Sequence, residues 1–328
     1  MVAPLKVALV STWNIACGVA EFAAYWKEAV EAADPTIQIE VVTDLHPRAI
    51  LGLNRSPDAP LDLVVLNYQA ALLSQWTPAL IQQVQQTFHL PVLAIYHDSG
   101  VPNTDQAKGI CAAATAFVVH EPYDDLDGNG RYWRMGVPDW RHPHLFDVSP
   151  SSWCGRRPIL GSIGFPYPWK NYDQLAAVTA AAGWALYLIA PTASEVDIAT
   201  WSMRNPHLRV HPTFMPRDDA VAYLSGCDAT AFVYTCANGG QSGAILQGIA
   251  ARKPVIAFST CRQNRALWED SLGRDVIYWT DSFDGVAEHL RTLPIQRVDP
   301  GTVALAAQDS WQQLGVKYAA LLRELVGR

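Results

Sequence analysis

The segment Ala237–Ala244 (ANGGQSGA) holds three glycines and a serine, directly after an apolar run that predicts a strand ending near Tyr234. Glycine lets a ligand approach the backbone, and Ser242 can cap the helix predicted over Ser242–Ala251. The start of a helix carries about half a positive charge, so these N–H groups would suit a phosphate or diphosphate. The alternative is a flexible capped turn. The Lys-Ser/Thr pair of a P-loop is missing, so triphosphate hydrolysis is not expected.

A lysine occupies an unusual position in the second half of the chain. The segment Gly164–Asn171 follows the predicted strand Ile159–Ile163, and two prolines stiffen it. Lys170 then precedes the predicted helix Tyr172–Ala182, where a cation opposes the helix dipole. A bound diphosphate would offset that cost. A solvated lysine is the alternative.

Two positions in the first half of the chain also follow predicted strands. His97 comes directly after Pro91–Tyr96, where a histidine could orient a sugar hydroxyl or share a proton, or could simply cap the next turn. Gly18 opens the predicted helix Gly18–Ala33 after the strand Lys6–Ser11. That loop lacks the G-x-G-x-x-G fingerprint of dinucleotide-binding folds, so it is either a ligand-facing backbone or a tight turn.

Two metal-like motifs are incomplete. Asp125–Gly130 matches the first half of a calcium loop, but Gly136 stands at the twelfth position, where a glutamate is required. His142 and His144 have no cysteine or carboxylate cluster at zinc-site spacing, so a solvated linker is expected. The sequence therefore predicts neither a metal site nor a resident cofactor.

Strands and helices alternate along the chain in two series separated by a proline-rich stretch near residue 145, which predicts right-handed crossovers and parallel sheets. We expect an α/β protein with two Rossmann-like, doubly wound domains facing each other across a cleft. The expected parts are residues 1–145, residues 146–300, and a C-terminal helix in 301–328 that begins near Val303. The further strands predicted are Ile37–Val42, Leu63–Leu66, Ala116–Val119, Leu186–Ile189, His207–His211, Ala229–Tyr234, Val255–Phe258 and Val276–Trp279; the further helices are Pro78–Phe88, Ala107–Ala113 and Arg217–Ser225.

Composition narrows the class of protein. Apolar residues make up 50% of the 328 residues and charged residues only 17%, which excludes a disordered chain. The formal net charge of −7 does not favour binding to nucleic acid or to an anionic membrane. No apolar run approaches the ~20 residues that span a bilayer. The six cysteines are widely spread, which indicates free thiols in a reducing cytoplasm.

Five segments of the chain resemble, in order, the GT-B glycosyltransferases, especially the family-4-like group that uses nucleotide sugars. These segments are the first loop, the end of the fourth strand, the opening of the second domain, the glycine-rich loop with its helix, and the terminal helix. They are Ser11–Phe22, Ala94–Gly100, Ile159–Leu175, Gly239–Thr260 and Asp309–Leu325. The resemblance implies that the terminal helix returns to pack on the first domain.

The resemblance also implies roles for individual residues. Lys170 matches the lysine that binds the donor diphosphate, and His97 matches the histidine that contacts the transferred sugar. We expect the remaining donor contacts from Gly18, Phe214, Gly240, Gln241, Ser242, Gly243 and Ala244. We expect the acceptor to pass Trp13, Asn14, Tyr68 and Gln69.

The sequence departs from the family pattern at three positions. Phe165 stands where an arginine often precedes the lysine, and Gly239 and Gln247 stand where two glutamates usually hold donor hydroxyls. Asn238 and Gln241 could supply neutral hydrogen bonds instead. The identity of the sugar is therefore open.

The combined prediction is a metal-independent glycosyltransferase that moves a sugar from a nucleoside diphosphate to an unidentified acceptor, which the resemblance implies occurs with retention. Two alternatives stay open. The same chemistry could act on a modified base in viral DNA, since Arg131, Arg134, Arg141, Arg156 and Arg157 gather near the linker. The chain could also be a catalytically silent nucleotide-sugar binding protein, because both glutamates are missing.

Overall fold

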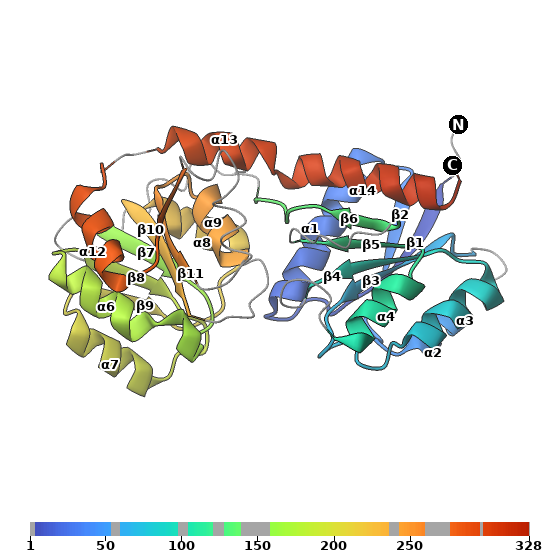
Figure 1. Cartoon of the computed structure of the whole chain (residues 1–328), viewed down its shortest axis with the longest axis horizontal. Coiled ribbons are helices and arrows are strands. Elements are labelled where there is room, and N and C mark those ends of the chain that lie inside the picture. Colours follow the sequence, from blue (N-terminus) through green and yellow to red (C-terminus); the bar gives the residue numbers. More distant parts are fainter. Residues whose placement is uncertain are drawn as a thin grey trace. The chain divides into compact units, whose positions relative to one another are not determined.

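The computed structural model describes residues 4–53, 60–97, 104–120, 128–138, 158–235, 243–259, 276–295 and 298–327. The chain divides into two compact units (Figure 1). Unit 1 comprises Met1–Gly136 with Trp311–Arg328, and unit 2 comprises Val137–Ser310. The first boundary therefore precedes the predicted 145/146, because the backbone N–H of Val137 already bonds to the carbonyl of Asp309.

Unit 1 is built on a parallel six-stranded sheet with the order β2-β1-β3-β4-β5-β6. Its strands are β1 (Leu5–Val10), β2 (Ile37–Val42), β3 (Leu63–Tyr68), β4 (Val92–Tyr96), β5 (Ala116–Val119) and β6 (Gly130–Tyr132). Its helices are α1 (Gly18–Ala33), α2 (Pro47–Leu53), α3 (Pro78–Phe88), α4 (Asp105–Ala113) and α14 (Trp311–Leu325).

Helices cover both faces of this sheet. One face packs its apolar side chains against α1 and α14, and the other packs against α2, α3 and α4. The strands β1, β3 and β4 are buried on both faces, which explains why they read as nearly continuous apolar runs rather than alternating ones. Alternate residues of β1 therefore divide between two apolar cores, with Leu9 in one and Val10 in the other.

Unit 2 is built on a second parallel six-stranded sheet, with the order β12-β11-β10-β7-β8-β9. Its strands are β7 (Ile159–Ile163), β8 (Ala185–Ile189), β9 (Leu208–His211), β10 (Ala229–Tyr234), β11 (Val255–Ser259) and β12 (Ile277–Thr280). Its helices are α6 (Tyr172–Ala181), α7 (Glu195–Arg204), α8 (Arg217–Ser225), α9 (Gly243–Ala250), α12 (Phe283–Thr292) and α13 (Pro300–Gln308). Residues of α6, α7 and α12 pack on one face.

The predicted fold class is confirmed, and most predicted strands agree with the structure to within two residues. Among the described helices, α2, α7 and α12 were not expected from the sequence. The single terminal helix predicted from Val303 is wrong, because Asp309 and Ser310 break it into α13, which belongs to unit 2, and α14, which belongs to unit 1. The expectation that the last helix packs on the N-terminal domain holds for α14.

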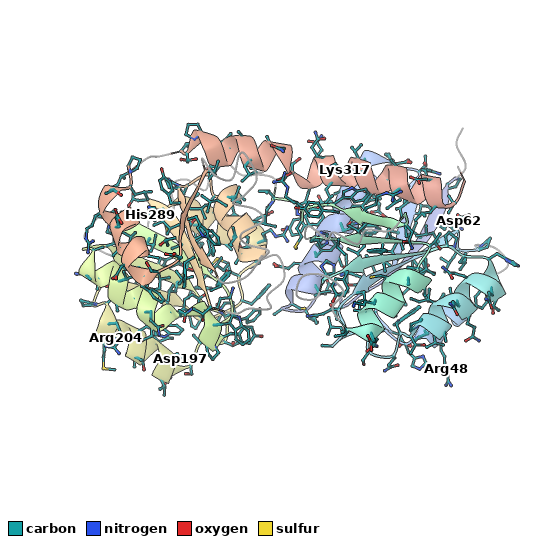
Figure 2. All side chains as sticks on the ribbon, viewed as in Figure 1. Arg48, Asp62, Asp197, Arg204, His289 and Lys317 are labelled. Atoms are coloured by element: carbon teal, nitrogen blue, oxygen red, sulfur yellow. The ribbon has the colours of Figure 1, made fainter. Side chains whose placement is uncertain are left out.

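Local sequence explains where several helices begin. The Thr77 hydroxyl accepts a hydrogen bond from the Leu80 N–H, and Pro78 occupies the first turn of α3. Ser194 and Asp197 form a reciprocal capping box on α7. Charged side chains such as Arg48, Asp197 and Lys317 lie at the rim of their units, clear of the strands (Figure 2). No helix in the described part of the chain is both long and apolar enough to pass through a bilayer.

Candidate functional site

Each sheet has one place where the strand order reverses, and ligands of doubly wound folds bind at such points, outside the carboxyl ends of the strands. In unit 2 the reversal lies between the neighbouring strands β7 and β10. In unit 1 it lies between β1 and β3. The loops that follow these four strands carry most of the residues predicted to bind ligands.

Lys170 lies at the reversal point of unit 2. Its ammonium nitrogen sits 3.7 Å from the centre of the Tyr234 ring, at the end of β10. A Cβ added to Gly164, at the end of β7, would lie 3.1 Å from the same nitrogen. Lys170 ends a short 3-10 helix (Pro168–Lys170), two residues before α6 begins at Tyr172, so its charge opposes the dipole of α6. The Tyr234 ring supplies part of the stabilisation that a bound diphosphate was expected to give this cation.

The loop that carries Lys170 is joined to β10 by hydrogen bonds. The side-chain amide of Asn171 donates to the Trp169 carbonyl at 2.9 Å and to the Val233 carbonyl at 3.3 Å. The Thr235 N–H donates to the Trp169 carbonyl at 3.0 Å. Asn171 itself has a positive φ of 52°. The ends of β7 and β10 are therefore held together before any ligand binds.

The glycine-rich loop lies mostly outside the described residues, which include neither Gly239 nor the predicted ligands Gly240, Gln241 and Ser242. Gly243 and Ala244 are the first residues of α9 and are half-buried. Within α9, Gln247 is buried and its Oε1 atom has no hydrogen-bond partner among the described residues. A neutral amide therefore stands where the resemblance predicts a donor-binding glutamate.

Exposed aromatic residues surround this edge of unit 2. Tyr167 and Trp169 are 49% and 42% exposed, and their rings stack with centroids 4.5 Å apart. Phe214, predicted near the nucleobase, is 39% exposed. It follows β9, which is two strands away from β7, so the topology does not place it beside Lys170.

In unit 1 a hydrogen-bond network crosses the reversal point. The side-chain nitrogen of buried Asn67, on β3, donates to the Ser11 hydroxyl at 2.9 Å and to the Val19 carbonyl at 3.0 Å. Its side-chain oxygen lies 2.5 Å from Nε2 of His97. The backbone N–H of His97 donates a hydrogen bond to the backbone carbonyl of Tyr68 at 2.9 Å. His97 therefore lies at the carboxyl edge of the sheet, as predicted, and its ring is fixed by Asn67.

A second histidine lies beside the first. The rings of His97 and His120 have centroids 5.2 Å apart, and the Phe22 ring contacts both. Nδ1 of His120 bonds to the Trp133 carbonyl at 2.8 Å. Burial, together with His120, holds the pKa of His97 well below its ordinary value, and burial lowers the pKa of His120 to about 4. Both rings are thus neutral near pH 7.

Sequence reasoning missed Asn67 and His120, although a signal for each was present. His120 directly follows the predicted strand Ala116–Val119, just as His97 follows its own strand, so the same rule would have selected it. Asn67 lies in an otherwise apolar run, and a buried amide usually has specific partners.

The other residues predicted in unit 1 differ in exposure. Gly18 is exposed at the start of α1, where Cys17 makes no side-chain capping bond. Asn14 is exposed, whereas Trp13 packs against the core beneath α1. Tyr68 is 0% exposed and its ring stacks on Tyr96 within the core, so its side chain does not face an acceptor. The remaining acceptor residue, Gln69, is half-buried and its carbonyl accepts two loop N–H bonds.

The remaining sequence motifs lie largely outside the described residues. The described residues contain no cluster of histidine, cysteine and carboxylate side chains able to hold a metal ion. Asp125–Asp127, His142 and His144 lie outside the described residues, as do Arg141, Arg156 and Arg157. Arg131 donates to the carbonyls of its own turn and lies 3.7 Å from Glu324. Cys17, Cys111 and Cys227 are free thiols, as expected.

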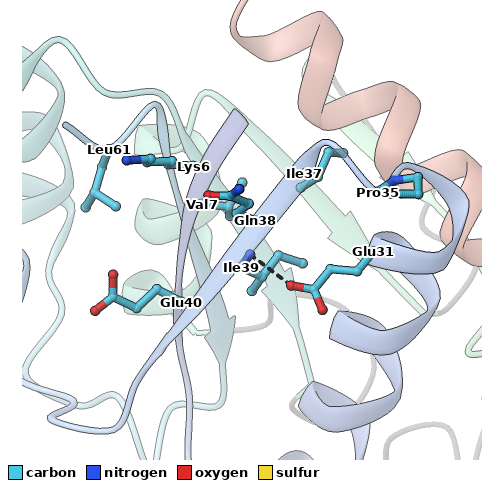
Figure 3. Close-up of a pocket in the computed structure, with 9 residues that line it drawn as sticks. All are labelled: Lys6, Val7, Glu31, Pro35, Ile37, Gln38, Ile39, Glu40 and Leu61. Carbon is cyan, nitrogen blue, oxygen red and sulfur yellow. Dashed lines mark hydrogen bonds between the residues drawn. The ribbon is translucent and has the colours of Figure 1, made fainter. Parts of the chain in front are cut away.

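An open pocket of about 690 Å³ lies along the edge strand β2 of unit 1 (Figure 3). Lys6, Glu31, Gln38 and Glu40 supply its polar lining. The Glu31 carboxylate accepts a hydrogen bond from the Ile39 N–H at 3.0 Å. The pocket lies towards the amino ends of β1 and β2, whereas ligands of this fold class bind at the carboxyl ends, so we do not assign the reaction to it.

No protein-family model and no curated protein matches the sequence. Solved structures do match over nearly the whole chain. AviGT4, a glycosyltransferase involved in avilamycin A biosynthesis, has 16% identity and a TM-score of 0.60, covering 99% of this chain and 98% of its own. The trehalose-6-phosphate phosphatase N-terminal domain of Candida albicans has 9% identity and a TM-score of 0.66, with 99% and 97% covered. A Burkholderia xenovorans UDP-forming trehalose-phosphate synthase, in complex with glucose-6-phosphate, has 9% identity and a TM-score of 0.63, with 98% and 100% covered.

These similarities establish the fold. The chain has the GT-B architecture of two Rossmann-like domains, with one parallel sheet in each, as the sequence resemblance implied. At such low sequence identity the structural similarity does not identify a substrate. One of the similar structures is a domain of a protein named as a phosphatase. The activity has to be argued from the residues of the site.

Proposed function

We propose that this protein transfers a sugar from a nucleoside-diphosphate sugar to an acceptor hydroxyl. The observation that carries the proposal is the position of Lys170, whose ammonium group is held against Tyr234 at the strand reversal of unit 2. A reversal point is where a doubly wound sheet binds nucleotides. The similarity of the whole chain to glycosyltransferase structures supports the same conclusion.

The main catalytic demand in such a transfer is the charge that develops on the departing diphosphate. Lys170 would stabilise that charge, together with backbone N–H groups at the start of α9, where a Cβ added to Gly243 would meet no described atom within 4 Å. Preorganised groups of this kind contribute about 3–4 kcal/mol each. A lysine and backbone amides can meet this demand without a metal ion, so we propose metal-independent transfer, with retention of the anomeric configuration as the resemblance implies.

In unit 1, His97 would contact the transferred sugar, while Gly18, Asn14 and Gln69 would face the ligand from the ends of β1 and β3. Tyr68 and Trp13 would act by supporting these loops from the core rather than by touching the acceptor. We propose a neutral hydroxyl-bearing acceptor, a small molecule or a glycan.

A second candidate function is a binding protein that holds a nucleotide sugar without turning it over. The buried, unpartnered amide oxygen of Gln247, at the position expected for a glutamate, favours it. An amide can bind a sugar hydroxyl, but it carries no charge to stabilise a cationic sugar ring.

The proposal is tested by adding UDP, GDP, ADP, CDP and dTDP and their sugars and measuring thermal stability. A ligand at 100 times its dissociation constant adds about 2.7 kcal/mol to the free energy of unfolding. The donor that stabilises the protein is then incubated with candidate acceptors, and the released nucleoside diphosphate is measured. Stabilisation with no release for any acceptor selects the binding protein. No stabilisation by any nucleotide contradicts both functions.

A further inference from the structure

Asn67 determines which ring nitrogen of His97 carries a proton. The Val19 carbonyl can only accept a hydrogen bond, so the Asn67 atom that faces it at 3.0 Å must be the NH₂ group. The oxygen of the same amide must therefore face His97, where it lies 2.5 Å from Nε2. Because an amide oxygen can only accept, Nε2 of His97 carries the proton, and the lone pair of a neutral ring is at Nδ1.

The same argument fixes the tautomer of His120. Its Nδ1 atom lies 2.8 Å from the Trp133 carbonyl, which can only accept, so Nδ1 carries the proton. Nε2 then holds a lone pair, and this atom is buried without a hydrogen-bond partner among the described residues. His120 is 5% exposed. Two neighbouring rings therefore both present acceptors, and neither presents a cation.

The groups packed around His97 disfavour its protonation. The Phe22 ring of α1 meets the His97 ring edge-on at 4.3 Å, and Trp311 of α14 packs against Phe22 at 5.0 Å. On the strands, Asn67 is neutral and His120 is the ionisable group whose charge would act on His97. A proton placed on Nδ1 would create a cation in these partly apolar surroundings, which is costly.

We propose that Asn67 and His120 are positioning residues that hold His97 as the neutral Nε2–H tautomer, so that Nδ1 accepts a hydrogen bond from a hydroxyl group of the bound sugar. This inference rests on the proposed function, and it specifies the substrate class. A neutral acceptor selects a hydroxyl donor and disfavours an anionic group, such as a phosphate or carboxylate, at the same position. An imidazolium would have the opposite preference.

The test is ¹⁵N NMR of the histidine rings in the full chain, with His97→Gln and His120→Gln used to assign their signals. We expect His97 to show the Nε2–H pattern and no titration near pH 6.5. This measurement requires neither activity nor a ligand, so its failure is separate from failure of the proposed function. A dominant Nδ1–H pattern for His97, or titration at the ordinary pKa of about 6.5, would overturn the inference.

Three variants distinguish positioning from simple packing. Asn67→Asp places a carboxylate against Nε2, which should raise the pKa of His97 by at least about 1. His120→Phe should raise the pKa of His97 and leave the tautomer unchanged. Asn129→Asp is the matched control, because Asn129 is in the same unit but bonds to the Ala114 carbonyl beside the amino end of β5. We expect no effect from it on His97, and an unchanged His97 in Asn67→Asp would contradict the inference.

Discussion

The ammonium nitrogen of Lys170 lies 3.7 Å from the centre of the Tyr234 ring, so one cation sits between the ends of β7 and β10. Phe165 stands where the resemblance implies that an arginine often occurs, so under the proposed function Lys170 would bear more of the donor charge than it would in an Arg–Lys pair. A lysine side chain has about 2 kcal/mol of rotamer entropy to lose on being fixed. The Tyr234 ring reduces that entropy cost, because it orders the Lys170 side chain before a ligand binds.

The first prediction concerns the charge of Lys170. Lys170→Met should lower the rate of sugar transfer by about 10²–10³-fold, because stabilisation of the departing diphosphate is lost. Lys170→Arg should recover part of the rate, since the charge remains but the compact ammonium geometry does not. The rate of nucleoside diphosphate release measures both variants. Lys317→Met, on an exposed position of α14, is the control and should leave the rate unchanged. Equal rates for Lys170→Met and the control would remove Lys170 from the mechanism.

The second prediction concerns the Tyr234 ring, which contacts the ammonium group of Lys170. Tyr234→Leu should weaken transfer by about 2–30-fold, which corresponds to a cation–π interaction of about 0.5–2 kcal/mol. Tyr234→Phe keeps the face of the ring and should stay near the wild-type rate. Unfolding by urea checks that both variants keep their stability within about 1 kcal/mol of each other. A loss in Tyr234→Phe as large as that in Tyr234→Leu would show that the hydroxyl group, rather than the ring, matters.

The sequence predicted the parts of this architecture that depend on local patterns. The strands β5, β7 and β10 are found at their predicted residues, because strands buried on both faces read as nearly uninterrupted apolar runs. The strand β2 is also found at its predicted residues, and its first four residues alternate between buried and exposed. The helix α7 was missed because its apolar residues do not form one buried face. Its one buried side chain is Trp201, and Val196 and Met203 are exposed. The break between α13 and α14 has no glycine or proline to mark it, so an unbroken helix was the natural expectation.

The candidate site was predictable where a residue follows a strand, and less so where tertiary contacts decide. Lys170 and His97 were predicted because each lies in a segment that follows a predicted strand, and the structure places both near the carboxyl ends of their sheets. Tyr68 was wrongly expected to face an acceptor, because its strand continues through residue 68 and turns the ring into the core. The role of Asn67 depends on the Val19 carbonyl, 48 positions away in sequence, and no local pattern reports such a contact.

The third prediction concerns stability as a function of pH. Burial lowers the pKa of His120 to about 4, whereas the unfolded chain has an ordinary value of about 6.5. Between these values the unfolded state binds a proton that the folded state does not, so the stability contributed by neutral His120 is fully present above pH 6.5. It is lost as the pH falls from about 6.5 to about 4, and it stays constant below that range.

Urea unfolding of the wild type and of His120→Phe at pH 7.5, 6.0 and 5.0 tests this expectation. The wild type should lose on the order of 1–2 kcal/mol more than the variant between pH 7.5 and 5.0, since each pKa unit is worth about 1.4 kcal/mol. His46→Gln removes a histidine outside the core and should keep the wild-type slope. Parallel pH profiles for the wild type and His120→Phe would mean that His120 takes up its proton without unfolding.

The fourth prediction concerns the close crossing of α1 and α14. A Cβ added to Gly315 would lie 2.3 Å from the carbonyl oxygen of Ala29 and 2.6 Å from its carbonyl carbon. Both are backbone atoms, so no side-chain rotation can relieve the overlap and the two helices must separate. Gly315→Ala should therefore destabilise unit 1 by about 1–3 kcal/mol, even though alanine favours a helix over glycine by about 1 kcal/mol. Val316→Ala, at a 55% exposed position on the next residue, should change stability by less than about 0.5 kcal/mol. Urea unfolding followed by tryptophan fluorescence measures the stability, and Trp26, which packs against Tyr318 across this crossing, contributes to the signal. A Gly315→Ala protein as stable as the wild type would show that α14 can shift along α1 without lowering the free energy of unfolding. The packing of α14 against α1 would then contribute little to the stability of unit 1.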